Sequence, residues 1–222
     1  MSDRVFRRVA IAGNPNTGKS TIFNSLTGLR QKVGNYPGVT VEKKTGRFFG
    51  SHGEAMELLD LPGSYSLQVR SPDEAVSRDV LLGRVPGTPR PDAIIAVLDA
   101  SNLDRHLYQV AQFLELEIPL IVALNMVDVA EQRGLAIDLH ALRDSLGVPV
   151  IPMVASRGQG IIELKQALSR ATLHVSDHRA QLPIVLEREV AALSRVIKGH
   201  AGSVRAEGCC CSRSKTIASC PR

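Results

Sequence analysis

Eight residues near the N-terminus have the types and spacing of a phosphate-binding loop. They read Gly-Asn-Pro-Asn-Thr-Gly-Lys-Ser from Gly13 to Ser20, between a short apolar run and a helical pattern. Glycines let backbone N–H groups face phosphates, and the N-terminus of the following helix adds positive potential. Lys19 is predicted to neutralise the β- and γ-phosphates, and the Ser20 hydroxyl to ligate Mg²⁺. An ordinary glycine turn is the weaker interpretation of this pattern.

A second motif, Asp60-Leu-Pro-Gly63, directly follows another apolar run. An Asp at the end of a strand can hold Mg²⁺ through a water molecule, and the amide of a glycine three residues later can meet the γ-phosphate. The spacing alone is common and means little. Its place after the second apolar run favours these roles for Asp60 and Gly63.

A third motif, Asn125-Met-Val-Asp128, ends a further apolar run and is predicted to select the base. The Asp128 carboxylate can accept hydrogen bonds from both N1–H and the exocyclic amine of guanine. Adenine offers no such pair of donors, and a buried carboxylate without a partner is costly. Asn125 is expected to support the base and the phosphate loop. Ala155-Ser156-Arg157 is expected to close over the base, so the four elements together predict GTP binding.

The segments between these motifs alternate between short apolar runs and amphipathic helical patterns. Apolar runs without alternation, such as Ala93–Leu98, are typical of central strands buried on both faces. The pattern predicts an α/β fold with a mostly parallel, six-stranded sheet flanked by helices, and a hairpin forming its antiparallel edge. The predicted strands are 9–12, 45–50, 55–60, 93–98, 120–124 and 148–154, and the predicted helices are 20–27, 103–116, 160–171 and 183–197.

Composition excludes several classes of protein. A hydrophobic content of 44% and a charged content of 22% are ordinary for a globular chain of 222 residues, so wholesale disorder is excluded. No apolar run approaches the length of a membrane-spanning helix and no secretory signal is visible, so we expect a soluble cytoplasmic chain. The net charge is +5, but residues 200–222 hold +3 of it. The weakly basic remainder argues against nucleic-acid binding.

Cysteine and histidine usage adds little chemistry. No cysteine occurs in the first 208 residues, which fits a reducing compartment. The C-terminal cluster could bind a metal or become acylated, but no supporting motif accompanies it and we assign it no role. His174 and His178 are four residues apart, yet no third ligand is spaced nearby, so solvated linker histidines are the favoured interpretation. The four cysteines are Cys209, Cys210, Cys211 and Cys220.

The motifs, and the residues between them, resemble the cytosolic G domain of the FeoB family of bacterial ferrous iron transporters. The resemblance covers about residues 7 to 171 and implies a P-loop NTPase with a Ras-like G-domain fold. It also implies a following helical domain that modulates nucleotide release, and a polytopic membrane domain that carries Fe²⁺. The segments that carry the resemblance are 13–28, 33–42, 60–67, 99–108, 123–128 and 149–158.

The resemblance implies further roles in the first switch and in cation binding. Thr40 is expected to complete the coordination of Mg²⁺ when GTP is bound. FeoB-like domains resemble K⁺-stimulated GTPases, so Asn16 and carbonyls of the 33–36 loop, those of Gly34 and Tyr36, are expected to hold K⁺ beside the phosphates. A turn-capping role for Asn16 is the alternative. Ser64 stands where many small GTPases carry a water-orienting Gln, so hydrolysis is expected to be slow or organised differently.

The chain departs from the family plan near its C-terminus. We assign residues 1–172 to the G domain, 173–199 to the start of the helical domain, and 200–222 to a disordered or foreign tail rich in Cys and Arg. A truncated chain, a frameshifted reading and a fragment each explain the change near Gly199. Transport therefore cannot be a property of this chain alone.

The predicted function is Mg²⁺-dependent, K⁺-stimulated GTP hydrolysis that regulates or drives Fe²⁺ uptake at the cytoplasmic face of the bacterial inner membrane. Expected partners are GTP and GDP, the membrane domain, small cytosolic Feo accessory proteins and a second copy of the chain, without nucleic acid. An RNA-associated GTPase and a GTP switch without turnover are the rivals. The expected catalytic residues are Asn16, Lys19, Thr40 and Gly63, and the expected nucleotide contacts are Gly13, Asn14, Pro15, Asn16, Thr17, Gly18, Lys19, Ser20, Thr21, Gly38, Val39, Thr40, Val41, Glu42, Asp60, Leu61, Pro62, Gly63, Asn125, Met126, Val127, Asp128, Val154, Ala155, Ser156 and Arg157.

Overall fold

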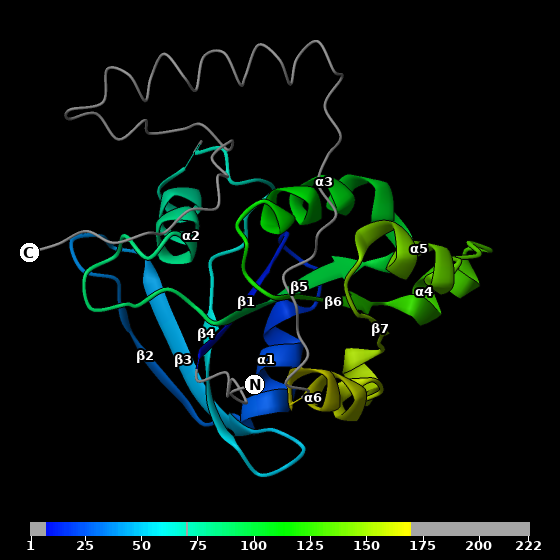
Figure 1. Ribbon diagram of the computed structural model, residues 1–222, viewed down its shortest axis with the longest axis horizontal. Coiled ribbons are helices and arrows are strands. Elements are labelled where there is room, and N and C mark those ends of the chain that lie inside the picture. The colour runs from blue at the N-terminus through cyan, green and yellow to red at the C-terminus, as the bar shows by residue number, and fades with distance from the viewer. Residues whose placement is uncertain (1–7, 70, 170–222) are drawn as a thin grey trace, which may run out of the picture. The chain divides into compact units, whose positions relative to one another are not determined.

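The computed structural model describes residues 8–69 and 71–169 (Figure 1). In this part of the chain a seven-stranded sheet has the order β2-β3-β4-β1-β5-β6-β7. Several predictions fall outside the described residues. They are the helix 183–197, the segments 173–199 and 200–222, both linker histidines and all four cysteines. The strands are β1 Arg8–Gly13, β2 Gln31–Asn35, β3 Glu42–Phe49, β4 Ala55–Asp60, β5 Ala93–Asp99, β6 Leu120–Asn125 and β7 Val150–Pro152. The α-helices are α1 Lys19–Thr27, α2 Pro72–Leu81, α3 Leu103–Leu114, α4 Val127–Gln132, α5 Leu139–Leu146 and α6 Ile161–Ser169, and the 3₁₀ turns are η1 Ala100–Asn102 and η2 Ala155–Arg157.

The prediction of a mostly parallel sheet is confirmed, but the predicted number of six strands is wrong. Strands β4, β1, β5, β6 and β7 run parallel, whereas β3 pairs antiparallel with both β2 and β4. The missed strand is β2, whose five residues are all exposed and which pairs only with β3. An edge strand with no buried face has no apolar alternation, and so the pattern that reveals other strands is absent. The predicted edge strand, β3, is therefore internal.

The sheet is covered by helices on both faces, as its central strands predict. Strands β5 and β6 are buried along nearly their whole length, and alternate residues point into two separate cores. Ile95 and Val97 pack with α1 and α6, whereas Ile94 and Ala96 pack with α2, α3 and α4. Figure 1 shows α1 and α6 together on one side of the sheet and α3, α4 and α5 on the other. Burial on both faces fixes the strands and hence the loops at their carboxyl ends.

Helix α1 begins without a side-chain cap, unlike α2 and α5. Ser71 accepts a hydrogen bond from the Glu74 amide at the start of α2, and Asp138 accepts two from amides at the start of α5. The residue before α1 is Gly18, in the left-handed conformation with φ of 85°. The first amides of a helix have no partners within the helix. Those of α1 are therefore available to an anion.

Among the described residues, no helix is both long enough and apolar enough to cross a lipid bilayer.

Candidate nucleotide-binding site

The predicted motifs meet at one edge of the sheet. Strands β4, β1, β5 and β6 are neighbours and run parallel, so their carboxyl ends lie side by side. The phosphate-binding loop follows β1, Asp60 ends β4, and Asn125 ends β6. Ala155 begins the turn after β7, the next strand in the sheet. Crevices at the carboxyl ends of parallel strands are the usual ligand sites of such sheets.

Two glycines of the phosphate-binding loop lie where a side chain would not fit. A Cβ atom at Gly13 would lie 2.5 Å from the carbonyl oxygen of Val97 on β5. A Cβ atom at Gly18 would collide with the side-chain amide of Asn125, and the positive φ of Gly18 also favours glycine. The Thr17 hydroxyl donates to the carbonyl oxygen of Asn14 at 3.0 Å within the loop. The loop is therefore packed tightly against the sheet.

The Asn125 side chain joins the phosphate-binding loop to the last loop of the site. Its amide nitrogen donates to the Thr17 carbonyl oxygen at 2.9 Å, and its amide oxygen accepts from the Ala155 backbone at 3.0 Å. Asn125 is only 3% exposed, so both bonds are shielded from water. The sequence predicted a supporting role for this residue. The structure shows that it connects three loops that are far apart in the chain.

Lys19 and Asp60 form an ion pair in the described structure. The Lys19 ammonium contacts the Asp60 carboxylate, and the two side chains are 13% and 10% exposed. Gly63 packs on Pro15, because a Cβ atom at Gly63 would lie 3.3 Å from Pro15 Cγ. The Ser64 amide donates to the Gly13 carbonyl oxygen at 3.3 Å. The segment after β4 thus lies directly against the phosphate-binding loop.

Asp128 lies in the first turn of α4, beside the loop that the sequence expected to close over the base. One carboxylate oxygen of Asp128 accepts from the Val129 amide at 3.0 Å. The other lies 3.7 Å from a guanidinium nitrogen of Arg157. Met126, just before α4, has a positive φ of 61°, which turns the chain from β6 into the helix. Ser156 and Arg157 are exposed. Arg157 and Asp128 are therefore neighbours, although they lie in different elements, η2 and α4.

The first-switch residues lie between β2 and β3, with Thr40 exposed. Neither the Thr40 nor the Ser20 hydroxyl has a hydrogen-bond partner among residues 8–69 and 71–169. Glu42 forms an ion pair with Lys44 at 3.3 Å, and the Val41 side chain is buried. The described contacts do not join Thr40 to Ser20 or Asp60. The remaining predicted residues Asn14, Thr21, Gly38, Val39, Leu61, Pro62, Val127 and Val154 flank the same loops.

In the structure, Gly34 and Tyr36, whose carbonyls are expected to hold K⁺, do not form a loop around Asn16. Gly34 lies within β2, opposite Lys43 of β3. The Tyr36 carbonyl accepts from the Val39 amide at 3.3 Å, and the Tyr36 ring is 2% exposed. Burial, and then the charge of Asp60, raise the pKa of the Tyr36 hydroxyl. The Asn16 side chain caps no turn among the described residues, although its φ of 65° is one that Asn tolerates.

Polar side chains of α2 and α3 hold the segment after Gly63, which sequence analysis did not anticipate. Ser77 donates to the Pro62 carbonyl oxygen at 3.1 Å. The Gln109 amide nitrogen donates to the Ser64 carbonyl oxygen at 2.7 Å and to its hydroxyl at 3.0 Å. Gln112 accepts from the Leu67 amide at 2.8 Å. Gln109 is fully buried, and its contact with Ser64 depends on how α3 packs over the sheet, so the sequence carried no local signal for it.

For the GTP hydrolysis that the sequence predicts, we expect the substitution Gln109→Met to slow the reaction about tenfold or more while changing GDP affinity less than about twofold. Methionine retains the volume of glutamine but cannot donate to Ser64. The residue after Gly63 then loses two hydrogen bonds, and Gly63 is held less firmly. Single-turnover hydrolysis and GDP titration measure the two effects. Faster hydrogen exchange at the 64–67 amides should accompany the loss.

Gln166→Met, at an exposed position on α6, is the control for Gln109→Met. If GDP affinity falls as much as hydrolysis does, Gln109 supports folding and has no specific role in positioning Gly63.

A hydrogen-bonded cluster surrounds the carboxyl end of β5. Burial alone would raise the pKa of the Asp99 carboxyl, but hydrogen bonds from Asn102 and Ser101 outweigh it and lower that pKa. His106 accepts from the Asp99 amide at 3.4 Å. Burial lowers the pKa of His106, and the charge of Asp99 opposes this only partly. Arg133 donates to the Ser101 hydroxyl at 3.1 Å, so the cluster links β5 with the region after α4.

We expect His106 to make the fold less stable on mild acidification. Its pKa is lower in the folded than in the unfolded chain, so below about pH 6.5 the unfolded chain binds the extra proton and the free energy of unfolding falls. In urea unfolding at several pH values, the free energy of unfolding should decrease less on acidification for His106→Gln than for the parent. Identical pH curves for parent and His106→Gln would contradict this assignment.

The fold and the four motifs at its sheet edge define the class: this is a P-loop domain of the GTPase fold. The family model for ferrous iron transport protein B matches residues 7–168, and the chain belongs to that family.

Individual relatives agree with the family assignment. The chain is 43% identical over 189 residues to the Fe(2+) transporter FeoB of Shigella flexneri, covering 85% of this chain and 24% of the relative. The chain thus spans about a quarter of that curated relative's length. The cytosolic domain of L. pneumophila FeoB superposes with a TM-score of 0.77 at 40% identity, covering 87% of this chain and 81% of that one. The T. maritima cytosolic domain in its GMPPNP form gives 0.74 at 35% identity, covering 86% and 74%.

Proposed function

We propose that this chain binds GTP and hydrolyses it to GDP and phosphate. The observation that carries the proposal is the Asn125 side chain, which ties the phosphate-binding loop to the loop of Ala155 beside the Asp128 carboxylate. One side chain thereby fixes the spacing between a phosphate site and a base site. The T. maritima relative was solved in GDP and GMPPNP forms, which supports a guanine nucleotide as the ligand.

The phosphates are assigned to the N-terminus of α1. The uncapped amides there, together with the amides of the glycine-rich loop, provide donors and positive potential for anionic oxygens. Lys19, now paired with Asp60, carries the charge that a phosphate oxygen requires. Gly63 lies against Pro15, where its amide can approach the terminal phosphate. These donors are already in position, so they would stabilise the negative charge that develops on that phosphate in the transition state.

The guanine is assigned to the region bordered by α4 and η2. Asp128 offers the two acceptor oxygens that the N1–H and amine of guanine require. One of these oxygens accepts a hydrogen bond from the neighbouring Val129 amide. The other lies 3.7 Å from a guanidinium nitrogen of the exposed Arg157. Arg157 can therefore shift and lay its aliphatic part over the base without breaking a close ion pair. The same carboxylate would remain unpaired beside adenine, which selects against ATP.

Mg²⁺ is proposed to bind Ser20 and Thr40 directly and Asp60 through water. The oxygen ligands suit Mg²⁺, and the two hydroxyls have no hydrogen-bond partners among the described residues. When bound, this ion would neutralise charge on the β- and γ-phosphates. Thr40 is exposed on the segment between β2 and β3, which must fold toward Ser20 to complete the set. The first switch supplies that movement.

K⁺ is proposed to bind the Asn16 side chain and the carbonyls of Gly34 and Tyr36. The Asn16 amide is exposed and uncommitted, and Ser64, the neighbour of Gly63, turns its hydroxyl toward Gln109 and away from solvent. Ser64 is therefore not free to orient water, which leaves room for a cation as the stabilising charge. When bound, the ion would stabilise negative charge that develops in the transition state. Gly34 must first leave its position opposite Lys43.

Single-turnover GTP hydrolysis in KCl and in NaCl tests the proposal. We expect faster hydrolysis in KCl for the parent, and a loss of about tenfold or more for Asn16→Ala in KCl only. Asn24→Ala, within α1, is the matched control and should behave as the parent. Equal rates in both salts would refute the K⁺ site. GTP binding without hydrolysis in either salt would instead indicate a nucleotide-dependent switch.

Within the cell, we infer that this GTPase serves a ferrous iron transporter. The curated relative named Fe(2+) transporter FeoB is about four times longer than the matched region, so a membrane domain in the same protein is the proposed partner. The domain would then lie at the cytoplasmic face of the bacterial inner membrane. Small cytosolic Feo proteins and a second copy of this chain are further proposed partners. Within the described part of the chain, nothing favours an RNA-associated GTPase over this assignment.

A further inference from the structure

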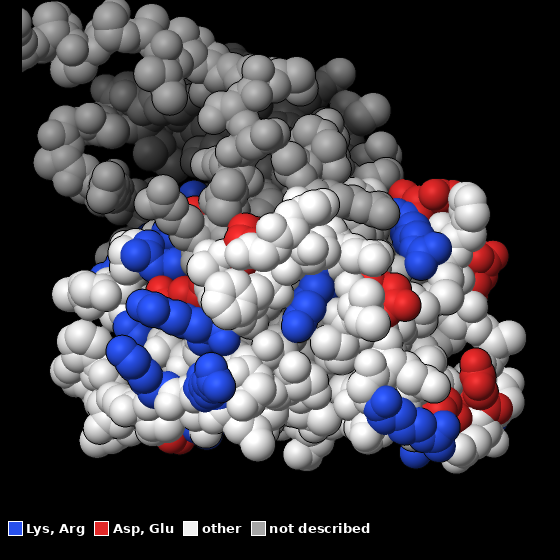
Figure 2. Space-filling model, turned by 90° about the horizontal axis from the view of Figure 1, so that it is seen from below, with Lys and Arg blue, Asp and Glu red and all other residues white. Residues whose placement is uncertain are grey.

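Positive charge is concentrated in one short part of the domain. Residues 30–49, which contain β2 and β3, hold five Lys or Arg and one Glu. The other described residues hold ten Lys or Arg and sixteen Asp or Glu. We call residues 29–49 the basic lobe. Figure 2 shows Lys and Arg side chains gathered over this side of the sheet. The lobe therefore carries a charge opposite to that of the rest of the described domain.

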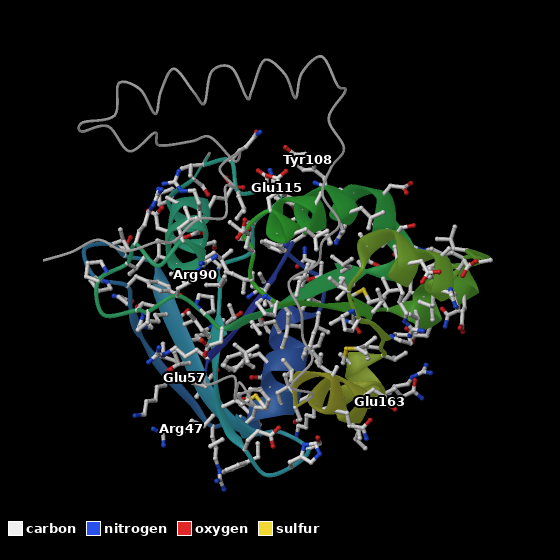
Figure 3. The ribbon with its side chains drawn as sticks, in the orientation of Figure 1. Arg47, Glu57, Arg90, Tyr108, Glu115 and Glu163 are labelled. Carbon is white, nitrogen blue, oxygen red and sulfur yellow. The ribbon has the colours of Figure 1, made fainter. Side chains whose placement is uncertain are left out.

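The strand register places the free cations of the lobe on one face of the sheet. Lys32 lies opposite Thr45, and Arg47 lies opposite Glu57, so alternation puts Lys32 and Arg47 on the same face. Both are exposed, and neither forms an ion pair with another described residue. Glu57 is instead paired with Arg8 at 3.2 Å. Figure 3 shows Arg47 extending from β3 away from the domain, with Glu115 and Glu163 on other elements.

Large apolar side chains are exposed in the same segment. Phe49 is 63% exposed and shares the face of Arg47, since the two are separated by two positions in β3. Leu29, two residues before β2, is 71% exposed, and Val33, within β2 on the opposite face, is 57% exposed. Cations beside exposed apolar side chains are typical of surfaces that bind the headgroup and acyl boundary of anionic bilayers.

The position of Arg47 argues against a role in attracting the nucleotide. Lys44 lies opposite Asp60, at the carboxyl end of β4 where the nucleotide site lies. Arg47 lies opposite Glu57, three positions nearer the amino end of the same strand. Arg8, at the amino end of β1, is next to Glu57 in the sheet. The positive face therefore extends away from the phosphate-binding loop.

We propose that the basic lobe of residues 29–49 binds an anionic phospholipid bilayer. Charge complementarity selects phosphodiester headgroups, and the exposed Phe49, on the same face as Arg47, selects a bilayer over nucleic acid. Binding would hold the domain with β2 and β3 against the membrane. The first switch lies within the lobe, so the bilayer contacts the strands that flank Thr40. The proposal depends on charge distribution and does not require that the chain hydrolyse GTP.

Cosedimentation of the 222-residue chain with vesicles tests the proposal. The probes are phosphatidylcholine vesicles with and without phosphatidylglycerol, at low and high salt. We expect binding only to vesicles that contain phosphatidylglycerol, and its loss at high salt. The double substitution Lys32→Glu and Arg47→Glu should lower the partition coefficient about tenfold or more. GDP affinity measured on the same protein should remain that of the parent, which verifies folding.

The matched control reverses two cations outside the lobe, Arg84→Glu and Lys165→Glu, for the same change in net charge. This control should bind vesicles nearly as well as the parent. Equal losses in both double variants would overturn the proposal, because net charge alone would then explain binding. Full binding by the lobe variant would also overturn it, since cations elsewhere, such as those of residues 200–222, would be responsible. Absence of binding by the parent, or tighter binding to single-stranded RNA than to vesicles, would refute it directly.

Discussion

The substitution Asp128→Asn is expected to lower the affinity for GDP roughly 10²–10³-fold. The carboxylate is the only group proposed to accept from both guanine donors, and an amide can accept with one atom only. Its NH₂ group would face the exocyclic amine of guanine, donor against donor. Xanthine has a carbonyl oxygen in place of that amine. Asp128→Asn should therefore bind xanthosine diphosphate more tightly than GDP, reversing the preference of the parent.

Titration with fluorescent GDP, ADP and xanthosine diphosphate measures this exchange of specificity. Glu131→Gln is the matched control, because it removes a carboxylate from an exposed position on the same helix, α4. The control should retain the parent's order of affinities. The guanine assignment fails if Asp128→Asn still prefers GDP to ADP by the parent's margin. It also fails if the parent itself binds ADP as well as GDP.

The sequence predicted an element correctly where its local residue pattern directly reflects its position in the fold. Continuous apolar runs predicted β5 and β6, because strands buried on both faces exclude polar residues from either side. The sequence identified the four motifs and their order, and the structure adds that they follow neighbouring strands at one edge of the sheet. Parallel strands present their carboxyl ends together, so this common edge follows from the topology.

The misses have definite physical causes. Strand β2 has no buried residue, so its own sequence pattern does not reveal it. Its strand conformation depends on hydrogen bonding to β3. Helix α2 did carry a local signal that was passed over: Ser71 and Glu74 are spaced as in a capping box, with Pro72 between them. Interactions such as Gln109 with Ser64 depend on how α3 packs over the sheet. No spacing within a linear sequence encodes such a contact.

The roles of individual side chains were also only partly visible. The sequence assigned Asn125 to supporting the base and the phosphate loop; its bond to Thr17 lies on that loop, whereas its role at the base stays a prediction. Thr40 and the proposed K⁺ ligands are a different case. Thr40 is exposed between β2 and β3, Gly34 is paired within β2, and Asn16 lies in the phosphate-binding loop, so the described contacts do not bring them together. A nucleotide and its cations would determine whether they meet. Those assignments remain predictions for the experiments above.

The substitution Lys19→Met is expected to reduce GTP hydrolysis roughly 10²–10³-fold, the loss typical of one preorganised donor in a transition state. Methionine preserves most of the length and apolar volume of lysine but removes the charge that faces the terminal phosphates. Single-turnover hydrolysis at saturating GTP separates this loss from weaker binding. Lys165→Met removes a lysine of α6 that no motif assigns to the site, and this variant should hydrolyse GTP as the parent does.

Lys19→Met should also destabilise the nucleotide-free domain, because Asp60 loses its partner at a position where its side chain is only 10% exposed. Removing one member of a buried pair typically costs about 3–5 kcal/mol, since the other charge remains without compensation. Adding Asp60→Asn should restore part of the free energy of unfolding without restoring hydrolysis. Additive destabilisation in the double variant would show that the two charges do not interact. Recovery of stability without recovery of hydrolysis would show that the uncompensated Asp60 charge causes the loss of stability and that the Lys19 charge is required for hydrolysis.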